Sequence, residues 1–190
     1  TKTALQTLPS HVLNNLDVLV NNAGLALGLE PADKTDFADW QQMVNTNILG
    51  LIHLTHEILP LMVANNDGYI INLSSTAGNY PYFGGNVYGA TKAFVTQFSL
   101  NLRADLVGKN IRVSNIEPGL CGGTEFSNIR FHGDDAKAAQ VYDSVQYVTP
   151  QDIANMVAWL IEQPKHVNIN RIEVMPTAQT FAGLKVVKDL

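Results

Sequence analysis

The sequence alternates between short apolar runs and longer segments whose apolar residues recur at helical spacing. The apolar runs are LDVLVNNAG (16–24), GYIINLSS (68–75), NIRVSNIEPG (110–119) and NRIEVMP (170–176). The segments with a period near 3.6 residues are 36–64, 86–107 and 149–163. Strands joined by helices of crossover length are typical of a parallel sheet covered on both faces, so an α/β fold is expected.

Individual residues indicate where the predicted helices begin and where they are interrupted. Thr149 is a candidate N-cap, followed by Pro150 at the first helical position and Asp152 in the first turn, which together predict a helix start. Pro60 lies inside the first helical segment and predicts a kink or break there. The opening TKTALQTLPSHVLNN resembles the end of a helix, and residues 120–149 are expected to be irregular or to form short helices.

Composition narrows the class of protein. The chain has 190 residues, of which 46% are hydrophobic and 15% charged, which fits one folded domain with a sizeable core. The formal net charge is −5 and no Lys/Arg cluster stands out, which argues against a nucleic-acid partner. No apolar run reaches the length that spans a bilayer, so no membrane association is expected. The single Cys121 excludes a disulfide framework within the chain and fits a reducing, cytoplasmic location.

Polar residues gather where the predicted strands end. Asn-Asn-Ala-Gly (21–24) ends the first run, Ser-Ser (74–75) the second and Glu-Pro-Gly (117–119) the third. In open α/β sheets the carboxyl ends of the strands form the edge where ligands bind. Tyr88 and Lys92 come after the second of these strands. They are spaced i and i+4, which places both side chains on one helix face.

The Tyr88–Lys92 spacing allows two interpretations: an amphipathic helix with one aromatic and one solvated charge, or a proton-transfer pair. A free tyrosine has a pKa of about 10, so roughly one phenol in a thousand is ionised at neutral pH. A lysine cation about 4 Å away favours the phenolate by roughly 4 kcal/mol at an effective dielectric near 20, before desolvation is subtracted. Such a pair would bring the pKa of Tyr88 towards working pH, as a general acid/base requires.

The chain resembles the short-chain dehydrogenase/reductase family over four motifs in series, from about residue 16 onwards. The motifs are NNAG (21–24), NTNILG (45–50), SSTAG with YGATK (74–92), and EPG (117–119) followed by a threonine. The resemblance implies a Rossmann-like, doubly wound parallel sheet in a single domain over residues 1–190. It also implies that Tyr88 is the general acid/base and that Ser75 places the reacting oxygen. Lys92 would hold the nicotinamide ribose, and Asn47 would anchor a water on the proton path. Ser74 competes with Ser75, and the thirteen-residue spacing to Tyr88 favours Ser75.

The resemblance assigns further residues to the cofactor. Asn22 and Gly24 match the turn near the adenine-side ribose, where the backbone approaches the cofactor. The residues that match the loop over the nicotinamide carboxamide are Pro118, Gly119, Leu120 and Thr124. This loop departs from the family pattern twice. Glu117 stands where Asn or Ser is commoner, and Thr124 lies six residues after the proline instead of five.

The glycine-rich phosphate loop of the family is not found in the sequence. GLALG (24–28) has the first spacing, but Leu29 and Glu30 follow where a glycine would close the motif, and it comes after a later strand. By comparison with the family, about 60 upstream residues are expected to be missing, including three strands, the phosphate loop and the residue that selects NAD or NADP. The 190 residues alone are therefore expected to be inactive.

Four stretches, 21–32, 75–106, 116–135 and 166–176, together resemble one subgroup of the family, the NADP-dependent 3-hydroxy acid dehydrogenases. This resemblance implies NADP as cofactor, no metal, and substrates such as L-allo-threonine, L-serine or 3-hydroxypropionate. It also implies a homotetramer built on the helices 36–64 and 86–107. A reductase of neutral ketones or aldehydes and a non-catalytic scaffold with the same fold are the alternatives.

Residues 120–149 match the substrate lid of the family, and Arg130 is the only arginine among them. A guanidinium can grip a carboxylate bidentately, so Arg130 is a candidate for selecting acids. A surface salt bridge with Asp134 or Asp135 is nearly as well supported. His132 is expected to be a loop residue and not a catalyst.

Overall fold

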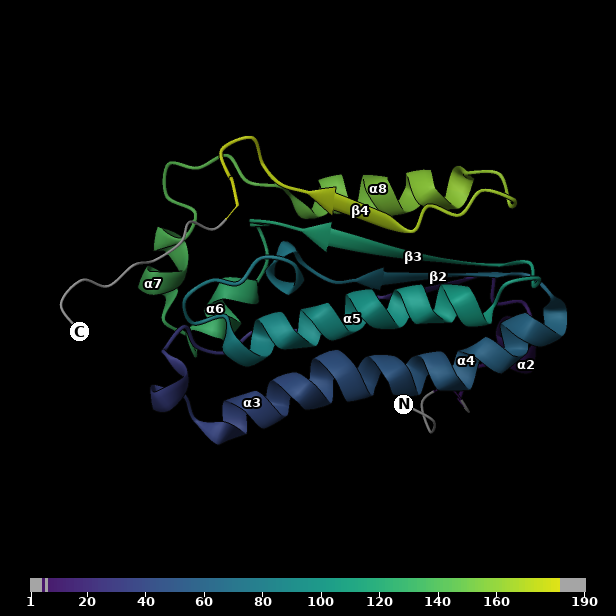
Figure 1. Ribbon diagram of the computed structural model, residues 1–190, viewed down its shortest axis with the longest axis horizontal. Coiled ribbons are helices and arrows are strands. Elements are labelled where there is room, and N and C mark those ends of the chain that lie inside the picture. The colour runs from purple at the N-terminus through teal and green to yellow at the C-terminus, as the bar shows by residue number, and fades with distance from the viewer. Residues whose placement is uncertain (1–4, 6, 182–190) are drawn as a thin grey trace.

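The computed structural model describes residue 5 and residues 7–181. Figure 1 shows one sheet with helices packed on both of its faces. The strands are β1 (Val18–Asn21), β2 (Gly68–Leu73), β3 (Ile111–Pro118) and β4 (Arg171–Val174). They pair in parallel in the order β1-β2-β3-β4. The predicted α/β fold with a parallel sheet is confirmed.

Helices occupy the segments between the strands, as the periodicity predicts. They are α2 (Ser10–Leu13), η1 (Ala32–Lys34), α3 (Phe37–Val44), η2 (Asn45–Gly50), α4 (Leu51–Asn65), η3 (Thr76–Gly78), α5 (Asn86–Asp105), α6 (Phe126–Arg130), α7 (Asp135–Gln140) and α8 (Pro150–Glu162). The short helix α2 lies in the opening stretch that resembled a helix end; residues 1–4 and 6 of that stretch are outside the described residues. The expected short helices in 120–149 are α6 and α7.

The two faces of the sheet bury separate apolar clusters. The cluster shared with α4 and α5 contains Ile58, Met62, Ile70, Leu102 and Val113. The cluster shared with α8 contains Tyr69, Ile71, Ile116 and Leu160. Ile70 and Ile71 are neighbours in β2, and their side chains point to opposite faces because side chains alternate along a strand. Each such buried side chain contributes about 1.5–3 kcal/mol, so both layers hold the sheet in place.

The predicted helix 36–64 is irregular at a different place from the one expected. It runs unbroken through Pro60, which lies on the exposed side, where water can bond to the carbonyl that lacks a helical partner. The irregularity is η2, a π-helical segment that joins α3 to α4. The helix does not break at Pro60, so that part of the expectation is wrong. The change in helix geometry lies over residues 45–50 instead.

The continuous helix Phe37–Asn65 corrects the expectation that no apolar segment is long enough to span a bilayer. Its 29 residues include a window with mean hydropathy 1.3, which is long and apolar enough to cross a membrane by length and composition. One such helix is weak evidence for a membrane span, because core helices of globular proteins meet the same criteria. Of that window, 28% is buried within the molecule.

The start of α8 follows the sequence signal. The Thr149 side chain accepts a hydrogen bond from the Asp152 backbone N–H, and the Asp152 side chain accepts one from the Thr149 backbone N–H, forming a capping box with Pro150 at the first position. The predicted cap is confirmed.

A row of three asparagines crosses the sheet close to the strand ends. Asn21 pairs in register with Asn72, and Asn72 pairs with Asn115. The Asn21 amide donates to the Asn72 side-chain oxygen at 2.8 Å, and the Asn72 amide donates to Ser99 Oγ of α5 at 2.8 Å. The Asn115 amide donates to Thr96 of α5 at 3.1 Å. These buried bonds fix α5, and the residues at its start, relative to the strand ends.

Candidate active site

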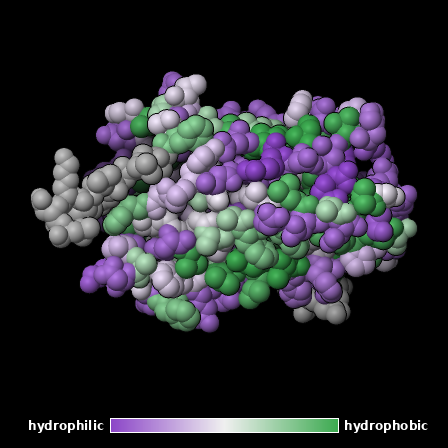
Figure 2. All heavy atoms as spheres, in the orientation of Figure 1, coloured by the Kyte–Doolittle hydropathy of each residue, from purple (hydrophilic) through white to green (hydrophobic). Residues whose placement is uncertain are grey.

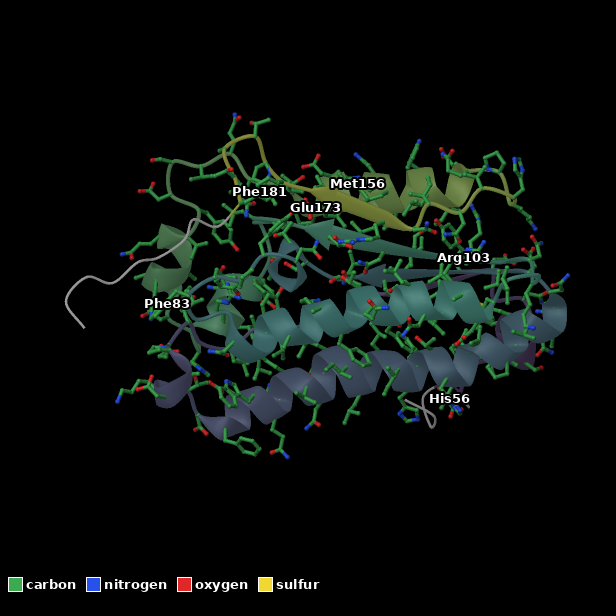
Figure 3. All side chains as sticks on the ribbon, viewed as in Figure 1. His56, Phe83, Arg103, Met156, Glu173 and Phe181 are labelled. Carbon is green, nitrogen blue, oxygen red and sulfur yellow. The ribbon has the colours of Figure 1, made fainter. Side chains whose placement is uncertain are left out.

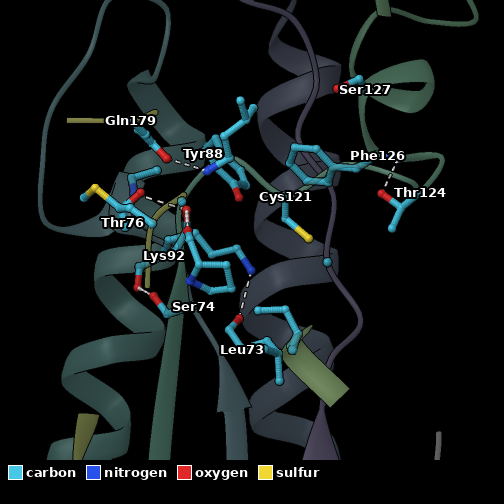
Figure 4. Close-up of a pocket in the computed structure, with 18 of the residues that line it drawn as sticks. Leu73, Ser74, Thr76, Tyr88, Lys92, Cys121, Thr124, Phe126, Ser127 and Gln179 are labelled. Carbon is cyan, nitrogen blue, oxygen red and sulfur yellow. Dashed lines mark hydrogen bonds between the residues drawn. The ribbon is translucent and has the colours of Figure 1, made fainter. Parts of the chain in front are cut away.

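A cavity of about 510 Å³ opens at the carboxyl ends of the strands, where the fold predicts a ligand site. Figure 4 shows side chains from β2, α5, the loop after β3 and the C-terminal segment converging on it. The residues expected at the site that line it are Asn22, Gly24, Ser75, Tyr88, Lys92, Pro118, Gly119, Leu120, Thr124 and Arg130. Asn47 alone of the expected set does not line the cavity.

Tyr88 and Lys92 lie in the first two turns of α5, and both are buried, with 8% and 6% of their surface exposed. The Lys92 ammonium donates to the Leu73 carbonyl oxygen at the end of β2, 2.9 Å away (Figure 4). It lies 5.9 Å from the centroid of the Tyr88 ring. The helix thus places both groups on one side, as the i, i+4 spacing predicts, with the lysine bonded to the sheet.

The electrostatics of Tyr88 differ from the sequence-based expectation. Burial raises the pKa of Tyr88 to about 12, so the phenol is protonated at neutral pH in this structure. The charge of Arg130 is the largest influence that lowers this pKa, followed by a hydrogen-bond interaction with Ser75. Burial also lowers the pKa of Lys92 from 10.5 to about 8. The expected lowering of the Tyr88 pKa by Lys92 is therefore absent, because burial dominates for both groups.

The two adjacent serines have different partners. Ser75 Oγ donates to the Pro118 carbonyl oxygen at 3.2 Å and accepts the backbone N–H of Ala77. Ser74 Oγ donates to the Lys92 carbonyl oxygen at 2.7 Å, inside the junction of β2 and α5. Both serines line the cavity, but Ser75 is bonded to the loop after β3, whereas Ser74 is bonded to the second turn of α5. The geometry agrees with the spacing argument for Ser75.

Asn47 lies in the π-helical segment η2 and is 1% exposed. Its amide donates to the Leu25 carbonyl oxygen at 2.8 Å and to Thr91 Oγ1 at 3.0 Å, and its oxygen accepts the Leu25 N–H at 2.9 Å. A Cβ added at Gly24 would lie 3.2 Å from the Lys92 ammonium and 3.3 Å from the Asn47 oxygen. Asn47 and Lys92 thus approach each other over Gly24, where a glycine leaves the needed room.

The residues assigned to the cofactor form one wall of the cavity. Gly119 donates its N–H to the Val174 carbonyl oxygen, and the Leu120 N–H donates to Gln179 Oε1 at 2.7 Å. A Cβ at Gly119 would collide with Gln179, so this glycine allows the C-terminal segment to close against the loop. Thr124 is exposed and accepts the Phe126 N–H at 3.3 Å. Pro118, Gly119 and Leu120 are half-exposed, so this wall is accessible to a flat ring such as nicotinamide.

Arg130 points into the cavity and makes no ion pair with either predicted aspartate. Its Nη2 donates to the Tyr82 hydroxyl at 3.0 Å, and its buried Nε has no hydrogen-bond partner. Asp134 caps α7, and Asp135 accepts a hydrogen bond from a side chain of α6. The alternative of a surface salt bridge is therefore wrong. His132 is an exposed loop residue with a positive φ of 53°, paired with Asp39.

Glu117, one of the departures from the family pattern, has a structural explanation. It is fully buried and accepts two hydrogen bonds from Arg171, from Nε at 2.6 Å and from Nη2 at 2.7 Å. The Asn79 amide bridges Glu117 and Glu173, which lies in β4 (Figure 3). The Tyr80 hydroxyl donates to Glu173 at 3.1 Å. This network joins the end of β3, the turn after Ser75 and β4 at the rim of the cavity.

Several cavity residues were missed by the sequence reasoning. They are Tyr82, Phe126, Cys121, Tyr142 and Gln179. No spacing rule links them to the Tyr88 motif. Tyr82 lies in the turn-rich stretch before α5, and nothing in its sequence neighbourhood indicates a role at the site. The excluded phosphate-loop match at 24–28 leads into an extended stretch, and its Gly28 N–H donates to the Arg130 carbonyl oxygen at 2.8 Å. That segment supports the lid helix.

A family model described as short chain dehydrogenase matches residues 1–134. The chain belongs to the short-chain dehydrogenase family. The resemblance found in the sequence, and with it the Rossmann-like fold, is confirmed. Apart from NTNILG, the motifs that carry the resemblance contribute residues to the lining of the cavity.

Relatives of this short-chain dehydrogenase carry more specific names. It is 70% identical over 186 residues to a probable NADP-dependent dehydrogenase of Haemophilus influenzae, covering 98% of this chain and 73% of that protein. It is 58% identical over 182 residues to the NADP-dependent 3-hydroxy acid dehydrogenase of Escherichia coli K12, covering 96% and 73%. The solved closed form of serine dehydrogenase complexed with NADP+ superposes with a TM-score of 0.96 at 56% identity, covering 99% of this chain and 75% of that one.

Proposed function

We propose that the intact protein is an NADP-dependent oxidoreductase that acts on the 3-hydroxyl group of small 3-hydroxy acids. The observation that carries the proposal is the position of Arg130, which lines the same cavity as Ser75, Tyr88 and Lys92. A proton-transfer group and a cation that has no carboxylate partner among the described residues thus face one space. The names of the relatives at 58% and 56% identity support this reading over a reductase of neutral carbonyls.

Tyr88 is the residue that moves the proton. In oxidation it takes the proton of the substrate hydroxyl, and in reduction it gives a proton to the carbonyl oxygen. NADP, when bound, accepts or supplies the hydride. Ser75, beside the Pro118 carbonyl, can turn its hydroxyl to the reacting oxygen and place it. Because burial holds the Tyr88 phenol protonated, nearby positive charge is needed for the oxidative direction.

Lys92 and Asn47 are assigned to support the proton transfer at Tyr88. Lys92 is protonated below a pKa of about 8 and holds its ammonium at the end of β2. In this position it can bond the nicotinamide ribose. Asn47 positions the 24–25 turn through the Leu25 backbone and reaches α5 through Thr91. We assign Asn47 to the proton path as a residue that shapes the wall beside the lysine.

The remaining assignments rest on the cavity lining. Asn22, Gly24, Pro118, Gly119, Leu120 and Thr124 are proposed to hold the cofactor. Residues 120–149, with α6 and α7, are proposed as the substrate lid of a single domain. At Gly24, which is exposed, the absence of a side chain is the feature that fits a closely approaching ribose.

The protein is proposed to be a cytoplasmic homotetramer. Figure 2 shows apolar side chains gathered over the region of α3, α4 and α5. Leu49 is 50% exposed there and Phe94 is 37% exposed. Apolar surface of this kind is typical of a subunit interface. Size measurement of the full-length protein in solution tests the assembly.

The first experiment follows nicotinamide absorbance with the full-length protein. NADP+ or NAD+ is offered with L-allo-threonine, L-serine or 3-hydroxypropionate, and reduction of NADP+ by these acids is expected. No turnover of any acid, with turnover of neutral alcohols, would refute the proposal. No turnover of either class would point to the non-catalytic scaffold.

The Arg130→Met variant tests the acid contact. Loss of a charged hydrogen bond of about 1.5–3 kcal/mol predicts a ten- to hundredfold rise in KM for 3-hydroxypropionate. The matched neutral substrate 3-hydroxypropionamide should be nearly unaffected. His132→Ala, in the same lid, is the control variant. Equal effects on the acid and the amide would contradict the role of Arg130.

A further inference from the structure

Two cations flank the ring of Tyr88, and they reach it from different elements. The Lys92 ammonium, from α5, lies 5.9 Å from the ring centroid and is bonded to the Leu73 carbonyl oxygen. The Arg130 guanidinium, from α6, lies 5.1 Å from the same centroid and 5.2 Å from the centroid of Phe126. Arg130 is therefore the nearer cation, and it belongs to the lid and not to the helix of the motif.

The position of the Arg130 guanidinium is fixed, yet its charge has no carboxylate partner among the described residues. Tyr82 accepts a hydrogen bond from Nη2, and the Gly28 N–H holds the Arg130 backbone carbonyl. The Nε atom is buried without a partner. In a low-dielectric site an uncompensated charge acts strongly on its neighbours. Two titratable groups of the cavity lie within reach of this charge: Tyr82, which is hydrogen-bonded to Nη2, and Tyr88, whose ring centroid is 5.1 Å from the guanidinium.

The groups facing Tyr88 act in opposite directions on its proton. Arg130 and Ser75 favour the phenolate, whereas burial and the nearby Tyr82 favour the phenol. Lys92 faces the ring as well, with its ammonium directed to the end of β2. Of the charges around the ring, the one on Arg130 has the largest effect, so any ligand that cancels this charge changes the balance at Tyr88.

We propose that Arg130 is a positioning residue for proton transfer as well as the acid contact: its guanidinium stabilises the Tyr88 phenolate, and a bound substrate carboxylate withdraws that stabilisation. The inference rests on the proposed function, because the carboxylate reaches Arg130 only if the site takes acids. At alkaline pH, where part of Tyr88 is phenolate, a bound acid then draws protons from solvent onto the Tyr88 oxygen. The protonated phenol is the state needed to protonate a carbonyl, so at alkaline pH an acid substrate prepares the site for reduction.

Titration calorimetry on the full-length enzyme with NADP+ tests the proposal. The probe is propionate, which has the acid group but no hydroxyl to oxidise, and propionamide is the matched neutral ligand. Repeating each titration in two buffers of different ionisation enthalpy gives both the affinity and the protons taken up. Propionate should bind with proton uptake that increases towards alkaline pH. Propionamide should bind without uptake.

Variants distinguish the acid contact at Arg130 from the coupling of that contact to the Tyr88 proton. The uptake should vanish in Tyr88→Phe and in Arg130→Met. Arg130→Met should also reduce the phenolate fraction of Tyr88 in the ligand-free holoenzyme by roughly ten- to a hundredfold at fixed pH, read from ultraviolet absorbance. Propionate affinity that is equal in wild type and Arg130→Met would overturn the acid contact itself. An affinity loss with no proton uptake, or uptake that persists in Tyr88→Phe, would overturn only the coupling.

Discussion

Arg171→Met is expected to destabilise the protein by removing the partner of a buried carboxylate. Glu117 has no exposed surface and accepts two hydrogen bonds from Arg171, at 2.6 and 2.7 Å. Breaking a buried pair by removing one partner costs about 3–5 kcal/mol. Two conditions reduce this figure. The Arg171 side chain is 42% exposed, so water can replace part of it, and Asn79 and Asn115 still donate to Glu117. We therefore expect a loss of about 2–3 kcal/mol.

Denaturant unfolding of the full-length protein measures this loss, and a double-mutant cycle isolates the pair. Glu117→Gln keeps the shape of the side chain and removes its charge. In the Glu117→Gln background, Arg171→Met should cost much less, which gives a coupling energy of about 1–3 kcal/mol. Arg103→Met, in the last turn of α5 (Figure 3), is the matched control and should cost below about 1 kcal/mol.

A coupling energy near zero would refute the reasoning. It would mean that water or the two asparagines satisfy Glu117 fully without the arginine. If Arg171→Met lost no more stability than the control Arg103→Met, the conclusion would be the same. If the coupling is present, the loop after β3 should also move in the variant, and the affinity for NADP should fall together with stability.

Three further substitutions test the site. Tyr88→Phe should lower kcat by about 10²–10⁴-fold with an unchanged circular dichroism spectrum, and near-normal turnover would exclude Tyr88 as the proton donor. Burial lowers the pKa of Lys92 from 10.5 to about 8, so its charge costs stability in full below pH 8, and this cost disappears as pH rises to 10.5. Lys92→Met should therefore gain up to about 3 kcal/mol at pH 7, and the gain over wild type should shrink by pH 10 in thermal melts; a constant difference would contradict the burial argument. Gly78→Ala would place a Cβ 2.7 Å from the Ala93 backbone nitrogen, and should lower the free energy of unfolding by about 1–3 kcal/mol and also lower kcat. Gly50→Ala, with 3.6 Å to its nearest atom, is the control and should be tolerated. Equal melting temperatures of the two variants would contradict this packing.

The sequence predicts features that depend on neighbours along the chain. The capping box at Thr149 and the shared face of Tyr88 and Lys92 need only three- or four-residue spacings, and both are present. The strand ends could be placed together because parallel strands fix which ends meet. These features decide the family and the general position of the site.

The sequence could not predict contacts made between distant segments. Arg171 lies 54 residues after Glu117, and Tyr82 lies 48 residues before Arg130. The effect of burial on Tyr88 also depends on what covers the ring, which is set by the lid and not by the motif. The residues that tune the chemistry therefore appear only when the packing is known.

The π-helical segment keeps two helices in phase while giving Asn47 a buried position. Met43 and Leu51 are both buried and lie eight residues apart, which in a regular α-helix would turn them about 80° away from each other. One extra residue in the π turn absorbs about 100° of rotation, so the two side chains come back to within about 20°. Shortening this segment by one residue would leave the outer packing of α3 and α4 almost unchanged. The deletion would instead change the place of Asn47, so a single residue of chain length here decides whether its amide can hold both the Leu25 carbonyl and Thr91.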